Sequence, residues 1–177
     1  MAIWRQLDPH DIEGLAHVAN VVHTELQERN SVFAERARLF PEGCLVLEEE
    51  ARICGYAISH PIRHRRPPAL DTFLGEIASE ADQFYIHDVC ILPELRGRGH
   101  AFEALDRLFA IAERYPTTCL VSVYGTAPFW ARFGFRPPDV VDHTLSGKLC
   151  GYGDGAVYLE RRKDSRSHCH RMSNNTS

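Results

Sequence analysis

The stretch that decides the fold is Val89-Cys90-Ile91-Leu92-Pro93-Glu94-Leu95-Arg96-Gly97-Arg98-Gly99-His100-Ala101. Its apolar first part is bounded by Pro93 and predicts the end of a strand, and the residues after Gly99 predict the start of an amphipathic helix. The first turn of a helix leaves about four backbone N–H groups without partners, and the helix dipole adds partial positive charge there. Glycines let the backbone approach an anion closely, and Arg96 and Arg98 can add charge from the rim. This turn therefore predicts a phosphate-binding site.

Two other phosphate-binding motifs are excluded by their spacing. A Walker loop ends in Gly-Lys-Ser or Gly-Lys-Thr, which this stretch lacks. A dinucleotide fingerprint needs a third small residue where the chain has Phe102, and an acidic residue about 20 positions later, where it has Thr117. A Gly-rich surface turn that only caps the following helix stays open as the alternative.

The same stretch resembles the pyrophosphate loop of the GNAT superfamily of acyl-CoA-dependent N-acetyltransferases, Arg/Gln-x-x-Gly-x-Gly/Ala. Arg96, Gly99 and Ala101 fill its fixed places. Residues 89–93 look like the central strand of that family, and residues 128–135, Pro-Phe-Trp-Ala-Arg-Phe-Gly-Phe, look like its late helix and Gly-Phe signature. The resemblance implies an α/β (α+β) fold with a mixed, mostly antiparallel central sheet, helices on both faces and a splayed central strand pair.

Hydrophobic periodicity predicts the other elements. Helices are expected over residues 8–30, 31–39, 100–115 and 127–133, and strands over residues 44–47, 53–62, 83–92, 118–124 and 156–160. This order of elements suggests an α/β sandwich around a mixed sheet. Residues 63–82 break the pattern and are expected to form a surface excursion near the active site, with one or two helical turns over residues 72–81. Residues 1–162 are expected to form one domain, and residues 163–177 a disordered basic tail.

The resemblance implies a binding site for acetyl-CoA as the acyl donor. Backbone groups of Val89, Cys90 and Ile91 would contact pantetheine and the thioester oxygen. The loop that would hold the pyrophosphate comprises Arg96, Gly97, Arg98, Gly99, His100 and Ala101, and the walls of the cofactor channel would be Phe129 and Trp130. A backbone N–H aimed at the thioester oxygen would stabilise the oxyanion that forms on attack.

The implied reaction is direct transfer of the acetyl group to a primary amine. A lysine-like amine has a pKa of about 10.4, so a base is expected. His87 and Asp88 precede the cofactor contacts, where the family often places its base. His87 can titrate near neutral pH, and Asp88 could orient it or bind the incoming cation. A hydrogen-bonded core histidine stays open as the other interpretation of His87.

The chain departs from the family at the general acid. Many members carry a tyrosine where this chain has Trp130, and an indole N–H does not act as an acid. Tyr124 is the nearest phenol in the sequence and is the expected substitute. Because a free thiol has a pKa of about 8.5, CoA is a tolerable leaving group and a dedicated acid could be dispensable. The departure also keeps a non-catalytic acyl-CoA-binding module open as an alternative function.

Composition argues against several classes of partner. The net charge of −4 disfavours nucleic-acid binding and favours a cationic acceptor. No apolar run approaches the about 20 residues that a membrane-spanning helix needs, so no membrane is expected. The six scattered cysteines, with no secretory segment at the start, favour the reducing cytoplasm. The expected partners are acetyl-CoA and a small amine, with protein amino groups as the other acceptor and a homodimer left open.

No metal site is expected. His168, Cys169 and His170 could ligate a soft metal, but they lack a second ligand cluster at a structural spacing.

Overall fold

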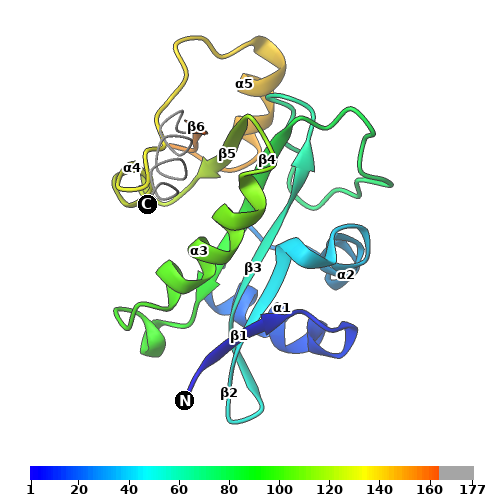
Figure 1. Cartoon of the computed structure of the whole chain (residues 1–177), viewed down its shortest axis with the longest axis vertical. Coiled ribbons are helices and arrows are strands. Elements are labelled where there is room, and N and C mark those ends of the chain that lie inside the picture. Colours follow the sequence, from blue (N-terminus) through cyan, green and yellow to red (C-terminus); the bar gives the residue numbers. More distant parts are fainter. Residues whose placement is uncertain (164–177) are drawn as a thin grey trace, which may run out of the picture.

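The computed structural model describes residues 1–163, and these form a six-stranded sheet flanked by helices (Figure 1). The strands lie in chain order across the sheet: β1 (Ile3–Gln6), β2 (Cys44–Glu49), β3 (Arg52–Ile62), β4 (Gln83–Ile91), β5 (Thr117–Ser122) and β6 (Val157–Arg162). The helices are α1 (Ile12–Val22), α2 (Asn30–Leu39), α3 (His100–Ala112), α4 (Ala127–Ala131) and α5 (His143–Cys150). Neighbouring strands are antiparallel except β4 and β5, which are parallel. The mixed, mostly antiparallel sheet confirms the predicted fold class.

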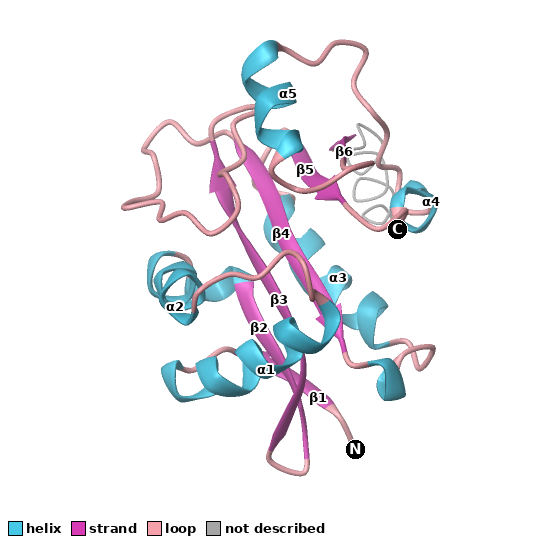
Figure 2. Cartoon of the chain, turned by 180° about the vertical axis from the view of Figure 1, so that it is seen from behind, coloured by secondary structure: helices cyan, strands magenta, loops and turns pink. Residues whose placement is uncertain are grey.

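Helices α1 and α2 cover one face of the sheet and α3 covers the other, as the opposite views show (Figure 1, Figure 2). Helices α1 and α3 pack through apolar stripes, with Leu15 and Val18 buried in α1 and Leu105 and Leu108 buried in α3. Burying one such side chain contributes about 1.5–3 kcal/mol, so packing rather than helix propensity holds these helices in place. Within residues 1–163, no helix is both long and apolar enough to cross a membrane.

The central strand pair splays, as predicted. Residues 83–86 of β4 pair with residues 117–120 of β5, and the pairing stops there. Beyond this point β4 stays paired with β3 as far as Ile91, while β5 stays paired with β6 as far as Ser122. A bulge lies at the same place: Ile86 and Asp88 face consecutive residues of β3, so His87 is the extra residue of β4.

The helix predicted over residues 8–30 is wrong in its second part. The helical segment starts as predicted, because Asp8 and Asp11 form a capping box. However, α1 ends at Val22, and residues 23–29 connect it to α2. Leu26 is the one apolar residue from 23 to 30 and is only partly buried, so there is no continuous apolar stripe to hold a longer helix on the sheet.

Two elements were not predicted, and one predicted feature is wrong. Strand β1 has four residues and helix α5 fully buries only Leu145, so neither carries a long periodic pattern. The helical turns expected over residues 72–81 do not form. In their place, the backbone N–H groups of Leu74 and Gly75 donate to the Glu35 carboxylate in α2. Residues 164–177 of the predicted tail, with His168, Cys169 and His170, lie outside the described residues.

A buried ion pair ties the excursion of residues 63–82 to α2. Arg36 is fully buried, and its guanidinium donates to Glu35 at 2.7 Å and to the carbonyl oxygen of Thr72 at 2.8 Å. Glu35 in turn accepts the N–H groups of Leu74 and Gly75 at 2.7 and 3.0 Å. Because both charges are away from water, removing one of them leaves the other uncompensated.

We expect Glu35→Ala to destabilise the fold by about 3–5 kcal/mol, because the Arg36 guanidinium stays buried without its counterion. Urea denaturation measures the loss. The control is Glu94→Ala, which breaks the exposed Arg52–Glu94 pair, 59% and 55% exposed, and should leave stability almost unchanged. Equal losses in the two variants would contradict an anchoring role for the buried pair.

Candidate active site

The glycine turn between β4 and α3 presents open backbone amides. Gly97 and Gly99 have left-handed backbones, with φ of 74° and 87°, which cost other residues about 1–2 kcal/mol. A Cβ atom at either position would meet no heavy atom within 4 Å. Gly99 is the N-cap of the 13-residue helix α3, and within residues 1–163 no side chain caps that end. Within the described part of the chain, the N–H groups of residues 97–101 make no backbone hydrogen bond and no side chain caps the helix, and free amides at a helix N-terminus suit an anionic ligand.

A cavity of about 680 Å³ lies between this turn and the splayed strands. Most of the residues predicted for the site line it: His87, Asp88, Val89, Cys90, Ile91, Arg96, Gly97, Gly99, His100, Ala101, Tyr124, Phe129 and Trp130. The exception is Arg98, which is exposed and does not line the cavity. Arg96 is held against the strand, because its Nε donates to the carbonyl oxygen of Ile91 at 2.9 Å. The turn and the bulged part of β4 therefore share one cavity.

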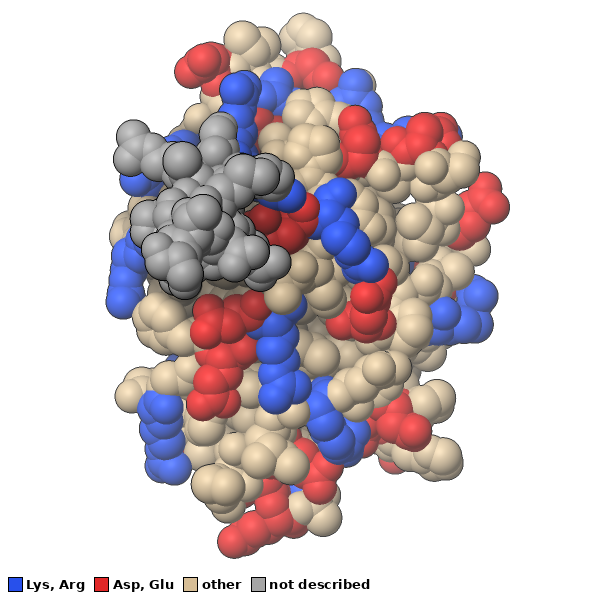
Figure 3. Space-filling view, viewed as in Figure 1, with Lys and Arg blue, Asp and Glu red and all other residues tan. Residues whose placement is uncertain are grey.

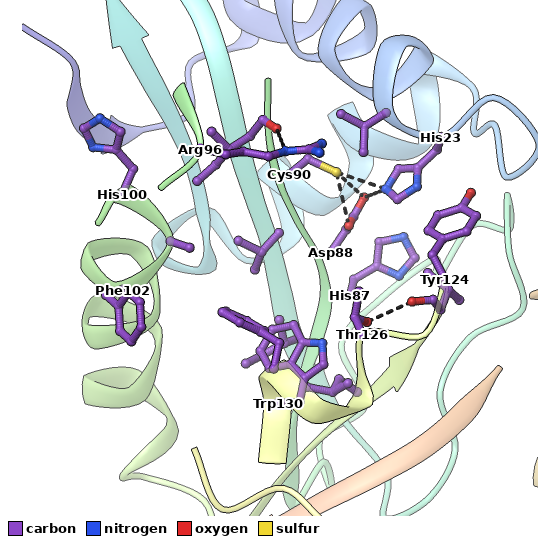
Figure 4. Close-up of a pocket in the computed structure, with 18 of the residues that line it drawn as sticks. His23, His87, Asp88, Cys90, Arg96, His100, Phe102, Tyr124, Thr126 and Trp130 are labelled. Carbon is purple, nitrogen blue, oxygen red and sulfur yellow. Dashed lines mark hydrogen bonds and ion pairs between the residues drawn. The ribbon is translucent and has the colours of Figure 1, made fainter. Parts of the chain in front are cut away.

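Asp88 is the centre of a polar cluster in the cavity (Figure 4). Its Oδ2 accepts hydrogen bonds from Tyr56 Oη at 2.5 Å and from His23 Nε2 at 2.8 Å. Burial by itself raises the pKa of Asp88, but the hydrogen bond and charge of His23 and the hydrogen bond of Tyr56 outweigh it, so the pKa lies below its ordinary value. Asp88 therefore carries a negative charge into the cavity at neutral pH.

His23 was not predicted as a site residue. It lies in the connection between α1 and α2, lines the cavity and stacks on Tyr124, with ring centroids 5.6 Å apart. Burial lowers the pKa of His23, but the hydrogen bond and charge of Asp88 and the charge of Glu28 raise it above its ordinary value. Periodicity placed His23 inside a helix, and no local sequence signal links it to a residue 65 positions away.

His87 contacts Glu28 rather than Asp88. Its Nε2 lies 2.6 Å from Glu28 Oε1, and the two side chains are 3% and 4% exposed. Glu28 also accepts the backbone N–H of Asp71 at 3.0 Å. Burial raises the pKa of Glu28, but the charge and hydrogen bond of His87 bring it below its ordinary value. This second histidine–carboxylate pair fastens residues 23–29 to the bulge of β4, and Asp88 does not orient His87.

Cys90 completes the cluster around Asp88. Its Sγ lies 3.0 Å from His23 Nε2 and 3.4 Å from Asp88 Oδ1. Burial raises the pKa of the Cys90 thiol well above its ordinary value, so this cysteine is not an activated nucleophile. One nitrogen, one oxygen and one sulfur atom of these three side chains lie within 4.8 Å of one another, which is close enough to hold a metal ion.

The aromatic residues take two different positions. Trp130 is 9% exposed and packs edge-on against Phe129 and Phe135, so its indole forms part of the cavity wall. Tyr124 is 55% exposed and has a left-handed backbone, with φ of 54°. Burial, together with the charges of Glu25 and Asp88, raises the pKa of Tyr124. Its phenol therefore keeps its proton at neutral pH and can donate a hydrogen bond at the mouth of the cavity.

We expect Glu28→Ala and His87→Ala each to cost about 1–3 kcal/mol of stability, because each leaves a buried polar partner without its hydrogen bond. The double variant should be less destabilised than the sum of the two single variants, by about 0.5–3 kcal/mol. Urea denaturation of all four proteins gives this coupling energy. Additive losses would show that the pair does not fasten the connection to β4.

Comparisons with solved structures identify the same fold in several proteins. The loading GNATL domain of CurA from Lyngbya majuscula aligns with a TM-score of 0.74 at 16% identity, over 92% of this chain and 98% of that one. Arabidopsis thaliana Naa50, in complex with a bisubstrate analogue, aligns with a TM-score of 0.65 at 11% identity, over 92% and 99%. N-acetylglutamate synthase from Neisseria gonorrhoeae, complexed with coenzyme A and N-acetyl-glutamate, aligns with a TM-score of 0.64 at 19% identity, over 92% of this chain and 35% of that one.

Comparison of the sequence assigns the family. No curated protein matches the chain. The profile of the acetyltransferase (GNAT) family matches residues 9–135, a range that contains the splayed strands, the glycine turn and both histidine–carboxylate pairs. The chain therefore belongs to the GNAT family of acetyltransferases.

Proposed function

We propose that the protein is an N-acetyltransferase that transfers an acetyl group from acetyl-CoA to the primary amine of a small molecule. The observation that carries the proposal is that one cavity joins the open amides of the glycine turn to the negative charge of Asp88. The first feature suits a diphosphate and the second suits an ammonium group. The cavity can therefore bring donor and acceptor together.

The donor end is assigned to the turn. Amides at the start of α3 would bind the pyrophosphate of CoA, since Gly97 and Gly99 leave room for its oxygens. Arg96, fixed to Ile91, would add positive charge from the cavity wall, and Arg98 would add charge from outside the lining. The aromatic side chains of Phe129 and Trp130 would line the channel.

The thioester is proposed to lie where β4 and β5 diverge. Beyond Ile86, β4 has no strand partner on its β5 side, so backbone groups around Val89 are free to bond to pantetheine and to the thioester oxygen. An N–H group aimed at that oxygen would stabilise the negative charge that develops during attack, and such a donor is typically worth about 10²- to 10³-fold in rate.

The acceptor end is assigned to Asp88 and its neighbours. Asp88 would draw the ammonium form of the amine into the cavity, and the Asp88–His23 pair would take up the first proton that the nitrogen loses, which leaves a neutral amine. In the transfer, the neutral nitrogen attacks the thioester carbonyl, the new C–N bond forms, and the C–S bond breaks as the oxyanion collapses. The thiolate of CoA takes a proton, and the second proton of the nitrogen replaces the one that the donor gives up. Tyr124 keeps its phenolic proton and is the proposed donor at this step, whereas Trp130 cannot supply one.

His87 is assigned a positioning role rather than that of a base, on the ground that Glu28 occupies its Nε2 and that its side chain is only 3% exposed. By holding Glu28, it would keep residues 23–29, and hence His23, in place against β4.

A cytoplasmic location is part of the proposal. Within residues 1–163, the cysteines at positions 44, 54, 90, 119 and 150 are free thiols, which fits a reducing compartment.

Gly99→Glu should abolish detectable binding of CoA, because it puts bulk and negative charge where the diphosphate is proposed to lie. Isothermal titration calorimetry with CoA measures this. Gly153→Glu is the matched control, since Gly153 also has a left-handed backbone, with φ of 92°, and open space at its Cβ. The control should keep its affinity, and unchanged affinity in Gly99→Glu would refute the assignment of the turn.

Asp88→Asn should lower kcat/KM for the amine by at least about 10-fold, because hydrogen bonds to charged groups contribute about 1.5–3 kcal/mol. Affinity for CoA should stay nearly unchanged. The assay follows the acetylated product by chromatography, over small amines and over short peptides with free N-termini. Turnover of peptides alone would favour protein amino groups as acceptors, and CoA binding without turnover of any amine would favour a binding module. Wild-type kinetics in Asp88→Asn would remove this residue from the mechanism.

A further inference from the structure

We propose that His23, Asp88 and Cys90 form a binding site for a soft divalent cation of the zinc type, and that the bound ion blocks the acceptor end of the cavity. The site itself follows from the arrangement of three side chains. Its effect on acetyl transfer rests on the function proposed above. We call this group the His23–Asp88–Cys90 cluster.

The ligand atoms of the cluster are those that zinc prefers. Imidazole nitrogen, carboxylate oxygen and thiolate sulfur are the common protein ligands of this ion. All three residues line the same cavity, so a fourth position can be filled by water or by another small ligand. Three protein ligands and one open position are the arrangement of an accessible zinc site rather than a closed structural one.

The spacing of the ligand atoms is close to that of a tetrahedral site. With zinc bonds of about 2.0 Å to nitrogen and oxygen and 2.3 Å to sulfur, the ligand atoms lie about 3.3 Å (N to O) and about 3.5 Å (S to N or O) apart. In the cluster, Nε2 of His23 is 2.8 Å from Asp88 Oδ2 and 3.0 Å from Cys90 Sγ, and the sulfur is 3.5 Å from the same Asp88 oxygen. An ion would therefore have to push these atoms apart by only about half an ångström.

The cluster stands on rigid elements. Asp88 and Cys90 are two residues apart on β4, and side chains at this spacing in a strand point to the same side. His23 is held opposite them by the Glu28–His87 pair, which fastens its connection to the strand. Tyr56 of β3 donates a hydrogen bond to Asp88 and so would orient this ligand from behind. Figure 4 shows the three side chains pointing toward one another.

Occupancy would compete with the amine. Binding of the ion would displace the thiol proton of Cys90 and any proton on His23 Nε2 into solvent. The negative charge of Asp88 would then face the metal instead of an ammonium group, and the cavity would lose its attraction for a cationic acceptor. The CoA turn is not part of the cluster, so donor binding should persist.

Cobalt(II) is the spectroscopic probe for the first test. The full chain is used with His168, Cys169 and His170 replaced by alanine, so that ligands in this stretch cannot contribute. We expect about one equivalent of cobalt to give a thiolate-to-metal charge-transfer band and intense visible bands of tetrahedral geometry, both removed by zinc. Failure of this protein to bind cobalt with a thiolate signal would overturn the proposal.

Variants identify the ligands. Cys90→Ala should lose the charge-transfer band, while Cys119→Ala, which removes another fully buried thiol outside the cavity lining, should keep it. Tyr56→Phe retains all three ligands and should weaken cobalt affinity by about 10- to 100-fold, as loss of an outer hydrogen bond to a ligand does. Circular dichroism checks the fold. If Cys90→Ala is unfolded, His23→Gln serves in its place, and an unchanged cobalt spectrum in a folded variant of either ligand overturns the site.

The functional consequence has its own readout. Each variant is compared with itself in the presence and absence of one equivalent of zinc, and product is followed by chromatography because zinc would bind the thiol released from CoA. We expect zinc to stop acetylation by the parent protein and a chelator to restore it. In Cys90→Ala, the rate without zinc should exceed the rate with zinc by a much smaller factor. Cobalt binding in a protein that acetylates no amine would leave the site standing and refute the proposed function. Full activity with the metal bound would refute the blocking.

Discussion

The end of hydrogen bonding between β4 and β5, after Ile86 and Leu120, is the constraint on which the rest of the structure depends. Each strand keeps its outer partner beyond that point, so the two halves of the sheet diverge while remaining ordered. Unpaired backbone groups inside a protein are costly unless something binds them. The gap opens next to the turn that precedes α3, and this proximity is why one cavity contains both free amides of a helix N-terminus and free edges of two strands.

The connection between α1 and α2 supplies the polar part of the site. It brings one histidine and one carboxylate to β4, where each meets a partner of the opposite type, His23 with Asp88 and Glu28 with His87. Burial alone would discharge such groups, but their mutual attraction keeps the pKa values of both acids low. The second pair is almost fully enclosed and can serve to hold the first. Charge is thus concentrated at the one end of an otherwise largely apolar cavity where an amine is proposed to enter.

A carboxylate that attracts an ammonium group also attracts a metal cation, and the two ligands differ in what else they require. An ammonium needs hydrogen-bond acceptors, whereas zinc needs lone pairs at tetrahedral spacing. The cluster around Asp88 offers both, because the imidazole and thiol lie within about half an ångström of the spacing that a zinc ion would impose on them. Recognition of the acceptor and sensitivity to a soft metal would therefore be two properties of the same side chains.

The glycine turn, the helix after it and the family were readable from the sequence, because they depend on local backbone chemistry: left-handed glycines, apolar periodicity and a fixed spacing from Arg96 to Ala101. Most of the predicted site residues do line the cavity, since they lie close in sequence to that turn. Short or weakly periodic segments led to errors. Strand β1 was missed, and residues 23–29 were predicted as helix although they connect α1 to α2. The partners of Asp88 and His87 were decided only by the tertiary structure, because the contacts join residues 65 and 59 positions apart. No local sequence pattern links residues so far apart in the chain. They meet because the connection between α1 and α2 packs against the bulged strand β4.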